Sequence, residues 1–264
     1  MSAGGKVYPP GALRLIEPDE FRSWILFEDE RLLVLNKPGL IVCHPSKHGP
    51  RSSLVGAVKE FTGLAAAHLI FRLDRETSGV VVLAKDPVTA ARLQRAMERR
   101  TVHKRYFVIL EGELAGPVRV DQPLGKDVAS VVWTKDTVTS APGSKAAVTL
   151  FTPLVARHGF TFAEVRPETG RKHQIRAHAE WLQHRVVGDK VYGPDAQLYV
   201  EFVSQGWNEK LAAALPLPRQ ALHCAEIDFG NAGEMQVFRA PLPEDLRAFC
   251  RERLAMTEAE LAGT

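Results

Sequence analysis

One acidic residue, Asp74, stands between two arginines in the segment RLDRETSG, which occupies residues 72–79. A polar turn follows it, and the apolar run VVVL comes next at residues 80–83. Such a carboxylate could form a salt bridge at the entrance of a strand. It could instead be kept ionised by the adjacent cations, so that it acts as a nucleophile or a general base. The residue types alone permit both roles.

A second concentration of charge lies in GRKHQIRAHAEWL, residues 170–182, which we predict to form a helix. The apolar stripe that would seat this helix consists of Ile175, Ala179 and Leu182. Arg171 and Lys172 would fall in its first turn, where the helix dipole disfavours each cation by about 0.3–1 kcal/mol. A bound anion such as phosphate would compensate for the unfavourable placement of these two cations. The alternative is a solvated basic face, on which the four-residue spacing aligns Lys172, Arg176 and Glu180.

Tyr106 stands at the start of a predicted strand, directly after His103, Lys104 and Arg105. A tyrosine at the end of a sheet is commonly an amphipathic residue with its ring packed and its hydroxyl in water. The functional interpretation is an aromatic platform for a planar ligand, or a phenol that handles a proton. Both interpretations are open at this point.

The composition is that of a globular protein, with 264 residues, 45% hydrophobic and 25% charged residues, and a net charge of +3. Three cysteines without a CxxC pair argue against a disulfide framework or a zinc site. His173 and His178 are five residues apart and do not share a helix face, and no HExxH, P-loop, GxGxxG or GxSxG motif occurs. We therefore expect no metal and no nucleotide site. The first residues contain no signal peptide or membrane anchor, which predicts a cytoplasmic protein.

Strands dominate the predicted elements, and helices are few. The predicted strands cover 24–42 (two strands broken by the Asn-Lys-Pro-Gly turn), 79–86, 103–112, 146–167 (a hairpin turning near His158) and 219–229. The predicted helices cover 86–102, with Asp86 as its cap and Pro87 in its first position, 170–182 and 243–256. Residues 125–145 are expected to be a polar excursion with short strands. This pattern predicts an α+β fold with a mixed, mostly antiparallel central sheet and flanking helices.

Seven segments point to one family. In chain order they are EDERLLVLNKPGLIVCHP, RLDRETSGVVVLAK, KRYFVILEG, ETGRKHQIRAH, VVGDKVYG, RQALHCAEIDF and APLPEDL. Over roughly residues 25–246 the chain thereby resembles the RluA-type pseudouridine synthases, which isomerise specific uridines in structured RNA. The resemblance implies the pseudouridine synthase fold with a central RNA-binding cleft. It also implies a reaction on ribosomal or transfer RNA that needs no cofactor and no metal.

The resemblance implies roles for individual residues as well. Asp74 corresponds to the catalytic aspartate, Tyr106 to the active-site tyrosine, and Arg176 to the arginine that pairs with the aspartate. Ile175 corresponds to an apolar residue of the pocket. Four further residues are expected to bind the RNA: Arg72, which would fill the position vacated by the flipped uridine, Arg171 and Lys172 on backbone phosphates, and His173.

Two departures from the family pattern are visible. Phe71 stands where the family usually has histidine, directly before Arg-Leu-Asp. Many relatives carry an N-terminal S4 RNA-binding domain, whereas residues 1–24 here are too few for one and are expected to be a tail. Residues 25–264 are then the catalytic domain, which we expect to bind RNA as a monomer. Within it, the segment 196–216 is interpreted as a loop that could cover the RNA groove.

Two other classes of function compete with the isomerase. One is an RNA-binding protein or chaperone that has lost catalysis, against which the presence of Asp74, Tyr106 and Arg176 argues. The other is a glycosidase, which usually needs a second carboxyl group opposite the first. Glu164 and Asp189 are the candidates for that second carboxyl group.

Overall fold

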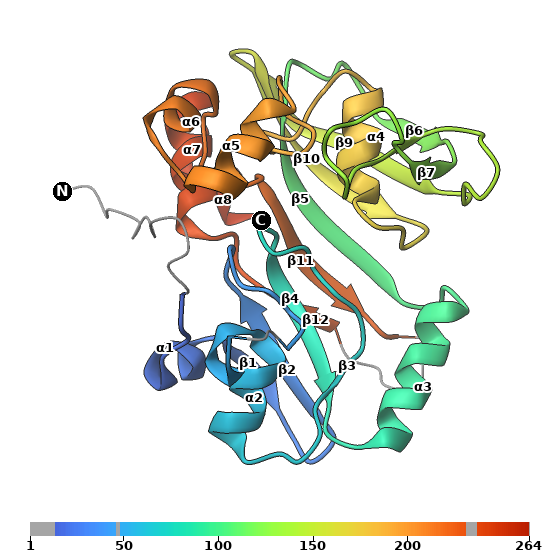
Figure 1. Ribbon diagram of the computed structural model, residues 1–264, viewed down its shortest axis with the longest axis vertical. Helices are drawn as coiled ribbons and strands as arrows, with labels where there is room; N and C mark the ends of the chain where they lie inside the picture. Colours follow the sequence, from blue (N-terminus) through green and yellow to red (C-terminus); the bar gives the residue numbers. More distant parts are fainter. Residues whose placement is uncertain (1–13, 46–47, 231–236, 264) are drawn as a thin grey trace.

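The computed structural model describes residues 14–45, 48–230 and 237–263 (Figure 1). Within them, the main sheet has ten strands. In spatial order these are β1 (Ile25–Glu28), β2 (Leu32–Lys37), β4 (Ser78–Ala84), β11 (Leu222–Asp228), β5 (His103–Glu111), β10 (Phe160–Pro167), β9 (Val148–Arg157) and β6 (Val118–Asp121), with β3 (His68–Leu69) beside β4 and β12 (Val237–Arg239) beside β11. β4 and β11 are parallel, and the other pairs are antiparallel. The prediction of a mixed, mostly antiparallel sheet is confirmed.

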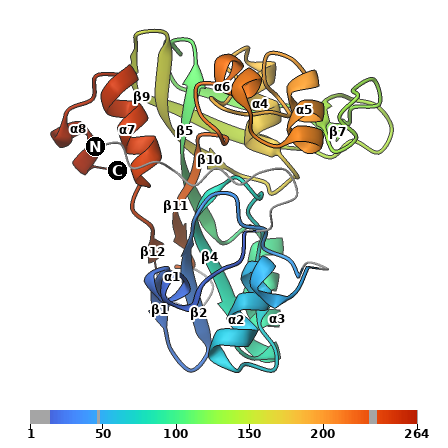
Figure 2. The ribbon, with the colours of Figure 1, turned by 60° about the vertical axis from the view of Figure 1, so that its left-hand side comes forward.

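Helices and a small second sheet surround this main sheet. They are α1 (Pro18–Ser23), the 3₁₀ turn η1 (Pro50–Ser52), α2 (Leu54–Thr62), α3 (Pro87–Glu98), β7 (Leu124–Lys126) paired with β8 (Asp136–Val138), α4 (Gln174–Trp181), α5 (Gln197–Gln205), α6 (Glu209–Ala214), α7 (Glu244–Arg253) and α8 (Glu258–Ala262). Figures 1 and 2 both show α1, α2 and α3 around the end of the sheet that holds β1, β2 and β4. They also show α4, α5 and α6 at the other end of the sheet, with α4 beside β9 and β10.

Burial explains the character of the central strands. All seven residues of β4 are buried, and so are most residues of β2 and β11. A strand that is covered on both faces carries a continuous apolar run in place of alternating residues, which is what residues 80–83 show. The long hairpin of β9 and β10 turns at His158 and Gly159, with φ angles of 56° and 77°. Two such residues form the tight turn that matches the twist of a hairpin, so the predicted turn is confirmed.

The helix α3 forms for the reasons that its sequence suggests. Asp86 precedes it in extended conformation, and its Oδ1 accepts a hydrogen bond from the Thr89 amide at 2.8 Å. Pro87 occupies the first position, where the missing amide proton costs nothing. Its apolar face is buried against the sheet through Ala90 and Leu93. The predicted cap and first residue are confirmed.

Two sequence-based expectations are wrong in detail. β1 and β2 turn at residues 29–31, where Asp29 Oδ1 accepts hydrogen bonds from the amides of Arg31 and Leu32 at 2.8 and 2.6 Å. The Asn-Lys-Pro-Gly segment lies at the end of β2 and does not separate the two strands. The segment 196–216, interpreted as a loop, instead contains the helices α5 and α6. These helices form because their leucines pack into a small cluster of their own, which consists of Leu198, Leu211 and Leu215.

The predicted tail, residues 1–24, lies only partly within the described residues, since residues 1–13 are outside them. From Ile16 onward the chain is packed, because Ile16, Phe21 and Trp24 are buried in the main core. The described part of this segment therefore belongs to the domain. In the part of the chain that the structure describes, none of the helices combines the length and the apolar character that spanning a bilayer requires.

Gly79 makes possible the parallel contact on which the sheet depends. It has a φ of 115° and is paired with Cys224 of β11, and a Cβ atom here would lie 2.1 Å from the Cys224 carbonyl oxygen. We therefore expect Gly79→Ala to lower the free energy of unfolding by about 3 kcal/mol, because both the backbone angle and the close approach exclude a side chain. Denaturant titration would measure the loss.

Gly116→Ala is the matched control. A Cβ atom there would meet none of the described atoms within 4 Å, so its expected change is within about 0.5 kcal/mol. Equal stability of the two variants would contradict the role given to Gly79.

Candidate active site

A cavity of about 610 Å³ opens between the two ends of the sheet. It is lined by the loop before β4, the start of β5 and the segment that leads into α4. All eight residues singled out in the sequence line this one cavity: Arg72, Asp74, Tyr106, Arg171, Lys172, His173, Ile175 and Arg176. Residues that are up to about a hundred positions apart in the chain are thus brought together by the order of the strands.

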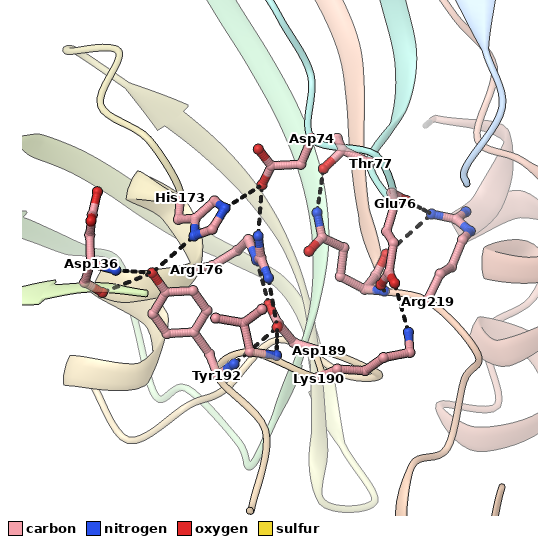
Figure 3. A network of polar contacts seen from close by, with 12 residues as sticks. Asp74, Glu76, Thr77, Asp136, His173, Arg176, Asp189, Lys190, Tyr192 and Arg219 are labelled. Atoms are coloured by element: carbon pink, nitrogen blue, oxygen red, sulfur yellow. Dashed lines mark hydrogen bonds and ion pairs between the residues drawn. The ribbon is translucent and has the colours of Figure 1, made fainter. Parts of the chain in front are cut away.

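The centre of the site is an arginine shared by two carboxylates (Figure 3). Arg176 Nη1 donates to Asp74 Oδ2 at 2.8 Å. The other edge of the guanidinium binds Asp189, with Nε 2.5 Å from Oδ2 and Nη2 2.8 Å from Oδ1. Arg176 and Asp189 are buried, whereas the Asp74 side chain keeps 32% of its surface exposed. The carboxylate of Asp74 is therefore the member of the triad that a ligand can reach.

The charges fix the ionisation of all three groups. Burial by itself would raise the pKa of Asp74 and of Asp189, but the guanidinium of Arg176 outweighs it and holds both below the usual value. Burial would lower the pKa of Arg176, and the two carboxylates reverse that effect, Asp189 more than Asp74. Asp74 is therefore a carboxylate at neutral pH, which is the form that nucleophilic or general-base chemistry requires.

The backbone that follows Asp189 binds its carboxylate. Its Oδ1 accepts hydrogen bonds from the amides of Val191 and Tyr192 at 2.9 and 3.0 Å. The ring of Tyr192 is buried, and its centre lies 5.1 Å from the guanidinium carbon of Arg176. The Tyr192 hydroxyl donates to the Asp136 carbonyl oxygen at 2.8 Å and accepts from the Asp136 amide at 3.2 Å. The partner of Arg176 is thus fixed before any substrate arrives.

His173 sets where α4 begins. Its φ of 54° is left-handed, so the helix begins at Gln174 and not at Arg171. Its Nε2 lies 3.9 Å from Asp74 Oδ2, and its Nδ1 lies 3.3 Å from the Tyr192 hydroxyl. Burial, and then the charge of Arg176, lowers the pKa of His173 to about 4. The imidazole is therefore neutral at pH 7 and adds no positive charge for RNA.

The expectation that Arg171 and Lys172 lie in the first turn of α4 is wrong. Both precede the helix, because the left-handed His173 is its N-cap and the helix begins at Gln174. Both still line the cavity. Arg171 Nε donates to the Ala146 carbonyl at 3.0 Å, and Lys172 Nζ pairs with Asp136 Oδ1 at 2.9 Å. The two cations are held at the mouth of the site by these contacts.

Tyr106 lies on β5, on the wall of the cavity, and is buried. Burial raises the pKa of its phenol well above the usual value, and the nearby Cys224 and Asp74 add to this effect. The phenol is therefore neutral in the resting protein. The buried position on the cavity wall is compatible with a platform for a planar ligand, and that role of Tyr106 stays a prediction.

Lys104 is a residue of the cavity that was missed in the sequence. Lys104 lies two positions before Tyr106, so the alternation of a strand puts both on the same face, and both line the cavity. Its Nζ lies 5.5 Å from the centre of the Phe71 ring, and burial lowers the pKa of Lys104. No carboxylate in the described part of the chain forms an ion pair with Lys104. The alternation of side chains along the predicted strand HKRYF places Lys104 on the same face as Tyr106, and this signal could have identified Lys104.

A second network clamps the loop that carries Asp74. Glu76 accepts a hydrogen bond from Lys190 Nζ at 2.8 Å and another from the Gln220 amide at 3.2 Å (Figure 3). Arg219 donates to the Glu76 carbonyl, and Gln220 Nε2 donates to the Thr77 hydroxyl. Because four polar contacts fix residues 76 and 77, the position of the carboxylate two residues earlier is fixed as well.

Lys190 also reaches the helix α5 and the segment that joins it to α6. Its Nζ lies 4.5 Å from the centre of the Phe202 ring and 5.6 Å from that of Trp207, and it donates to the Pro218 carbonyl at 2.7 Å. Its side chain is almost fully buried. A buried ammonium group is tolerated only when it is well paired, so Glu76 and these rings together account for its position.

The two acids that a glycosidase would use do not face the cavity. Asp189 lies behind Arg176, and Glu164 on β10 pairs with Arg166 at 2.7 Å, and neither lines the cavity. Within the described residues there is also no group of three or more histidine, cysteine or acidic side chains that could hold a metal ion. The two acids considered for a glycosidase are therefore not placed opposite Asp74 in the cavity.

The buried pair of Arg176 and Asp189 predicts how stability depends on pH. The folded protein holds the pKa of Asp189 below that of the unfolded chain, so this contribution is complete above about pH 4 and is lost as the pH falls through the folded-state pKa. We expect Asp189→Asn to lower the free energy of unfolding at pH 7 by about 3–5 kcal/mol, because it leaves a buried guanidinium with less charge to balance it.

Denaturant titrations at pH 7, 5 and 3.5 would measure this prediction. The difference between the wild type and Asp189→Asn should be the same at pH 7 and pH 5 and smaller at pH 3.5. Asp121→Asn, which changes an exposed acid paired with Arg119, is the control and should change little at any pH. A difference that stays constant with pH would contradict the assignment.

Comparisons with known proteins identify the family of this chain. The family described as RNA pseudouridylate synthase matches residues 31–181. The ribosomal large subunit pseudouridine synthase D of Vibrio vulnificus is 35% identical over 232 residues, which cover 84% of this chain and 68% of that protein. The uncharacterized RNA pseudouridine synthase YjbO of Bacillus subtilis is 34% identical over 229 residues, covering 84% of this chain and 73% of that protein.

Among solved structures, the human RNA pseudouridylate synthase domain containing 4 is similar with a TM-score of 0.71 and 23% identity. The alignment covers 91% of this chain and 96% of that one, so the two share their fold. The expected pseudouridine synthase fold is thereby confirmed. The chain belongs to the RNA pseudouridylate synthase family, whose members are enzymes that isomerise uridine to pseudouridine in RNA.

Proposed function

We propose that Asp74 is the catalytic group with which this enzyme isomerises uridine, and that ribosomal RNA is its substrate. One contact carries the proposal: Arg176 Nη1 donates to Asp74 Oδ2 at 2.8 Å inside a cavity with further cations at its mouth. The relative named ribosomal large subunit pseudouridine synthase D supports ribosomal over transfer RNA. The cytoplasmic location and the monomeric state stay predictions.

The target uridine has to enter the cavity as a flipped nucleotide. Within an RNA stack its glycosidic bond and C5 are out of reach, and extrusion costs a few kcal/mol. The cavity of about 610 Å³ has the size of a small-ligand site. Ile175 and Phe71 give it apolar wall area, and Arg72, which is exposed at its edge, would take the place of the extruded base.

The reaction is a rearrangement that balances within the substrate. The bond from C1′ to N1 breaks, the uracil turns within the cavity, and a bond from C1′ to C5 forms. C5 loses a proton and N1 gains one, so no electrons are exchanged and no cofactor is required. Asp74 can begin by attack on the ribose, by addition to the base or by removal of a ribose proton, and each route requires its ionised form.

Arg176 and Tyr106 assist Asp74 in this proposal. Arg176 keeps the carboxylate charged and oriented, and its second bond to Asp189 prevents it from turning away. Tyr106 stacks on the uracil and assists the removal of the C5 proton. Because its pKa is raised, the phenol is protonated when RNA arrives, and it must pass on its own proton before it accepts another.

The RNA backbone would be held by cations at the mouth and on the wall of the cavity. Arg171 and Lys172 bind phosphates there, and the neutral His173 contacts the nucleotide without adding charge. We add Lys104 to this set. Its ammonium group lacks a carboxylate partner in the described part of the chain and shares a face with Tyr106, so a phosphate of the flipped nucleotide would neutralise it.

Replacement of Lys104 should change how RNA binding depends on salt. Each phosphate contact contributes about 0.7 to the slope of log K against log salt for single-stranded RNA. We expect Lys104→Gln to reduce the slope by about that amount and to raise KM more than it lowers kcat. Binding titrations between 50 and 200 mM salt would measure it, with the exposed Lys59→Gln as the control. An unchanged slope would show that Lys104 holds no phosphate.

Replacement of the proposed catalytic group provides the decisive test. Asp74→Asn keeps the shape of the side chain but removes its charge, so we expect it to abolish tritium release from RNA labelled at C5 of uridine. RNA binding should stay within about twofold of the wild type, because the basic residues around the cavity are unchanged. The exposed Asp19→Asn is the control and should release tritium at the wild-type rate.

The same experiment separates the enzyme from the alternative of an RNA-binding protein without catalysis. That alternative predicts no tritium release and no carbodiimide-detectable pseudouridine even with the wild-type protein. Retained release by Asp74→Asn would instead exclude Asp74 as the catalytic group.

A further inference from the structure

A hairpin beside the cavity carries an unusual group of exposed apolar side chains. The loop of residues 127–135 joins β7 to β8 and contains Val128, Val131 and Trp133, which are 91%, 61% and 74% exposed. Figures 1 and 2 both show this region projecting from the end of the molecule that holds α4. Single exposed apolar residues are common, but three of them within six residues of one loop suggest a contact surface.

The exposure of Trp133 is built into the loop. The Asp127 amide donates to the Lys135 carbonyl at 3.1 Å, and Asp127 Oδ1 accepts from the amides of Ala129 and Ser130. Val132 is fully buried in a cluster that includes Leu124, Ala177 and Tyr192. The Lys135 amide donates to the Val132 carbonyl at 2.9 Å and closes a turn with Trp133 at its corner, so the buried Val132 anchors the turn while Trp133 stays exposed. The ring is therefore presented to solvent by an ordered scaffold.

The scaffold is joined directly to the active site. Asp136 follows Trp133 by three residues, so their Cα atoms are at most about 11 Å apart. Asp136 binds the Tyr192 hydroxyl and pairs with Lys172, which lines the cavity. A strand of RNA that places one nucleotide in the cavity therefore passes within a few nucleotides of the exposed ring.

The charge beside the ring indicates which partner it takes. Lys126 Nζ lies 5.7 Å from the centre of the Trp133 ring, and Lys126 itself is exposed. An aromatic face flanked by a cation is the combination that binds an unpaired base together with its phosphate. A second protein chain would need about 800 Å² on each partner, or 20–30 residues, which a patch of three apolar residues does not provide.

We propose that Trp133 is a stacking platform for an unpaired base near the target uridine, with Lys126 on the adjacent phosphate. The inference deepens the proposed function, because it concerns how the same enzyme holds its RNA. The platform selects RNA that has a loop or a bulge around the target, since a base in a continuous duplex has no free face to offer. This preference for unpaired RNA adds to the requirement that the target nucleotide fit into the cavity.

Binding to two RNA probes tests the platform. The first is a labelled hairpin with a uridine-containing loop of seven nucleotides, and the second is a blunt duplex of equal length. Loss of one stacked base weakens binding between about fivefold and 150-fold. We expect Trp133→Ala to show such a loss for the hairpin and less than a twofold change for the duplex, measured by fluorescence anisotropy. Trp133→Phe should keep most of the hairpin affinity, because it keeps an aromatic face.

Trp181→Ala is the matched control, because Trp181 on α4 is also exposed, at 47%, and has no cation recorded over its ring in the described residues. It should bind both probes like the wild type. Equal losses of Trp133→Ala for the hairpin and the duplex, or no loss for either, would overturn the proposal. So would a sedimentation experiment in which Trp133→Ala turns a dimer of the wild type into a monomer.

The result is independent of the catalytic assignment. Asp74→Asn should bind the hairpin like the wild type and should show the same loss when it is combined with Trp133→Ala. If Asp74→Asn still releases tritium while the effect of Trp133→Ala on binding is as expected, the catalytic proposal fails and the platform stands. If tritium release depends on Asp74 but hairpin binding does not depend on Trp133, the platform alone fails.

Discussion

The whole site depends on one guanidinium that is divided between two carboxylates. Two of the nitrogens of Arg176 bind Asp189, and a third is left for Asp74. A lysine could not replace it, because a single ammonium group cannot hold two carboxylates on opposite edges at fixed angles. Asp189 is completely buried and is tolerable only because it is paired and bound by two backbone amides. The geometry around Asp74 therefore depends on how Arg176 pairs with Asp189, a carboxylate that does not line the cavity.

The main sheet brings Asp74 and Tyr106 to the same cavity. Asp74 precedes β4, Tyr106 lies on β5, and β11 runs between these two strands. The parallel contact of β4 and β11 is close enough to require Gly79, so the loop before β4 has little freedom to move relative to β5. Packing of the backbone and pairing of charges thus restrict the same short loop from two directions.

Much of this could be predicted from the sequence, but only where the cause is local or a motif is specific. The cap and first turn of α3 depend on adjacent residues, and the eight proposed site residues were found because they lie in motifs of known order. The left-handed His173 could not be predicted, since its conformation is stabilised by contacts with Tyr192 and Asp74 that are remote in the chain. Asp189 was considered as the second carboxyl group of a glycosidase because no local pattern in the sequence indicates that it pairs with Arg176 outside the cavity. The helices α5 and α6 were interpreted as a loop because their apolar cluster is small and largely their own.

The contacts of Lys190 change how the segment 197–214 has to be regarded. The ammonium group of Lys190 touches Glu76 on one side and the rings of Phe202 and Trp207 on the other. A chain shortened by residues 197–214 would lose both rings and would leave the buried ammonium group only its contacts with Glu76 and the Pro218 carbonyl. These two helices stand outside the main sheet and look like an optional insertion, yet the segment 197–214 supplies the aromatic surroundings of the ammonium group that binds Glu76 in the loop before β4.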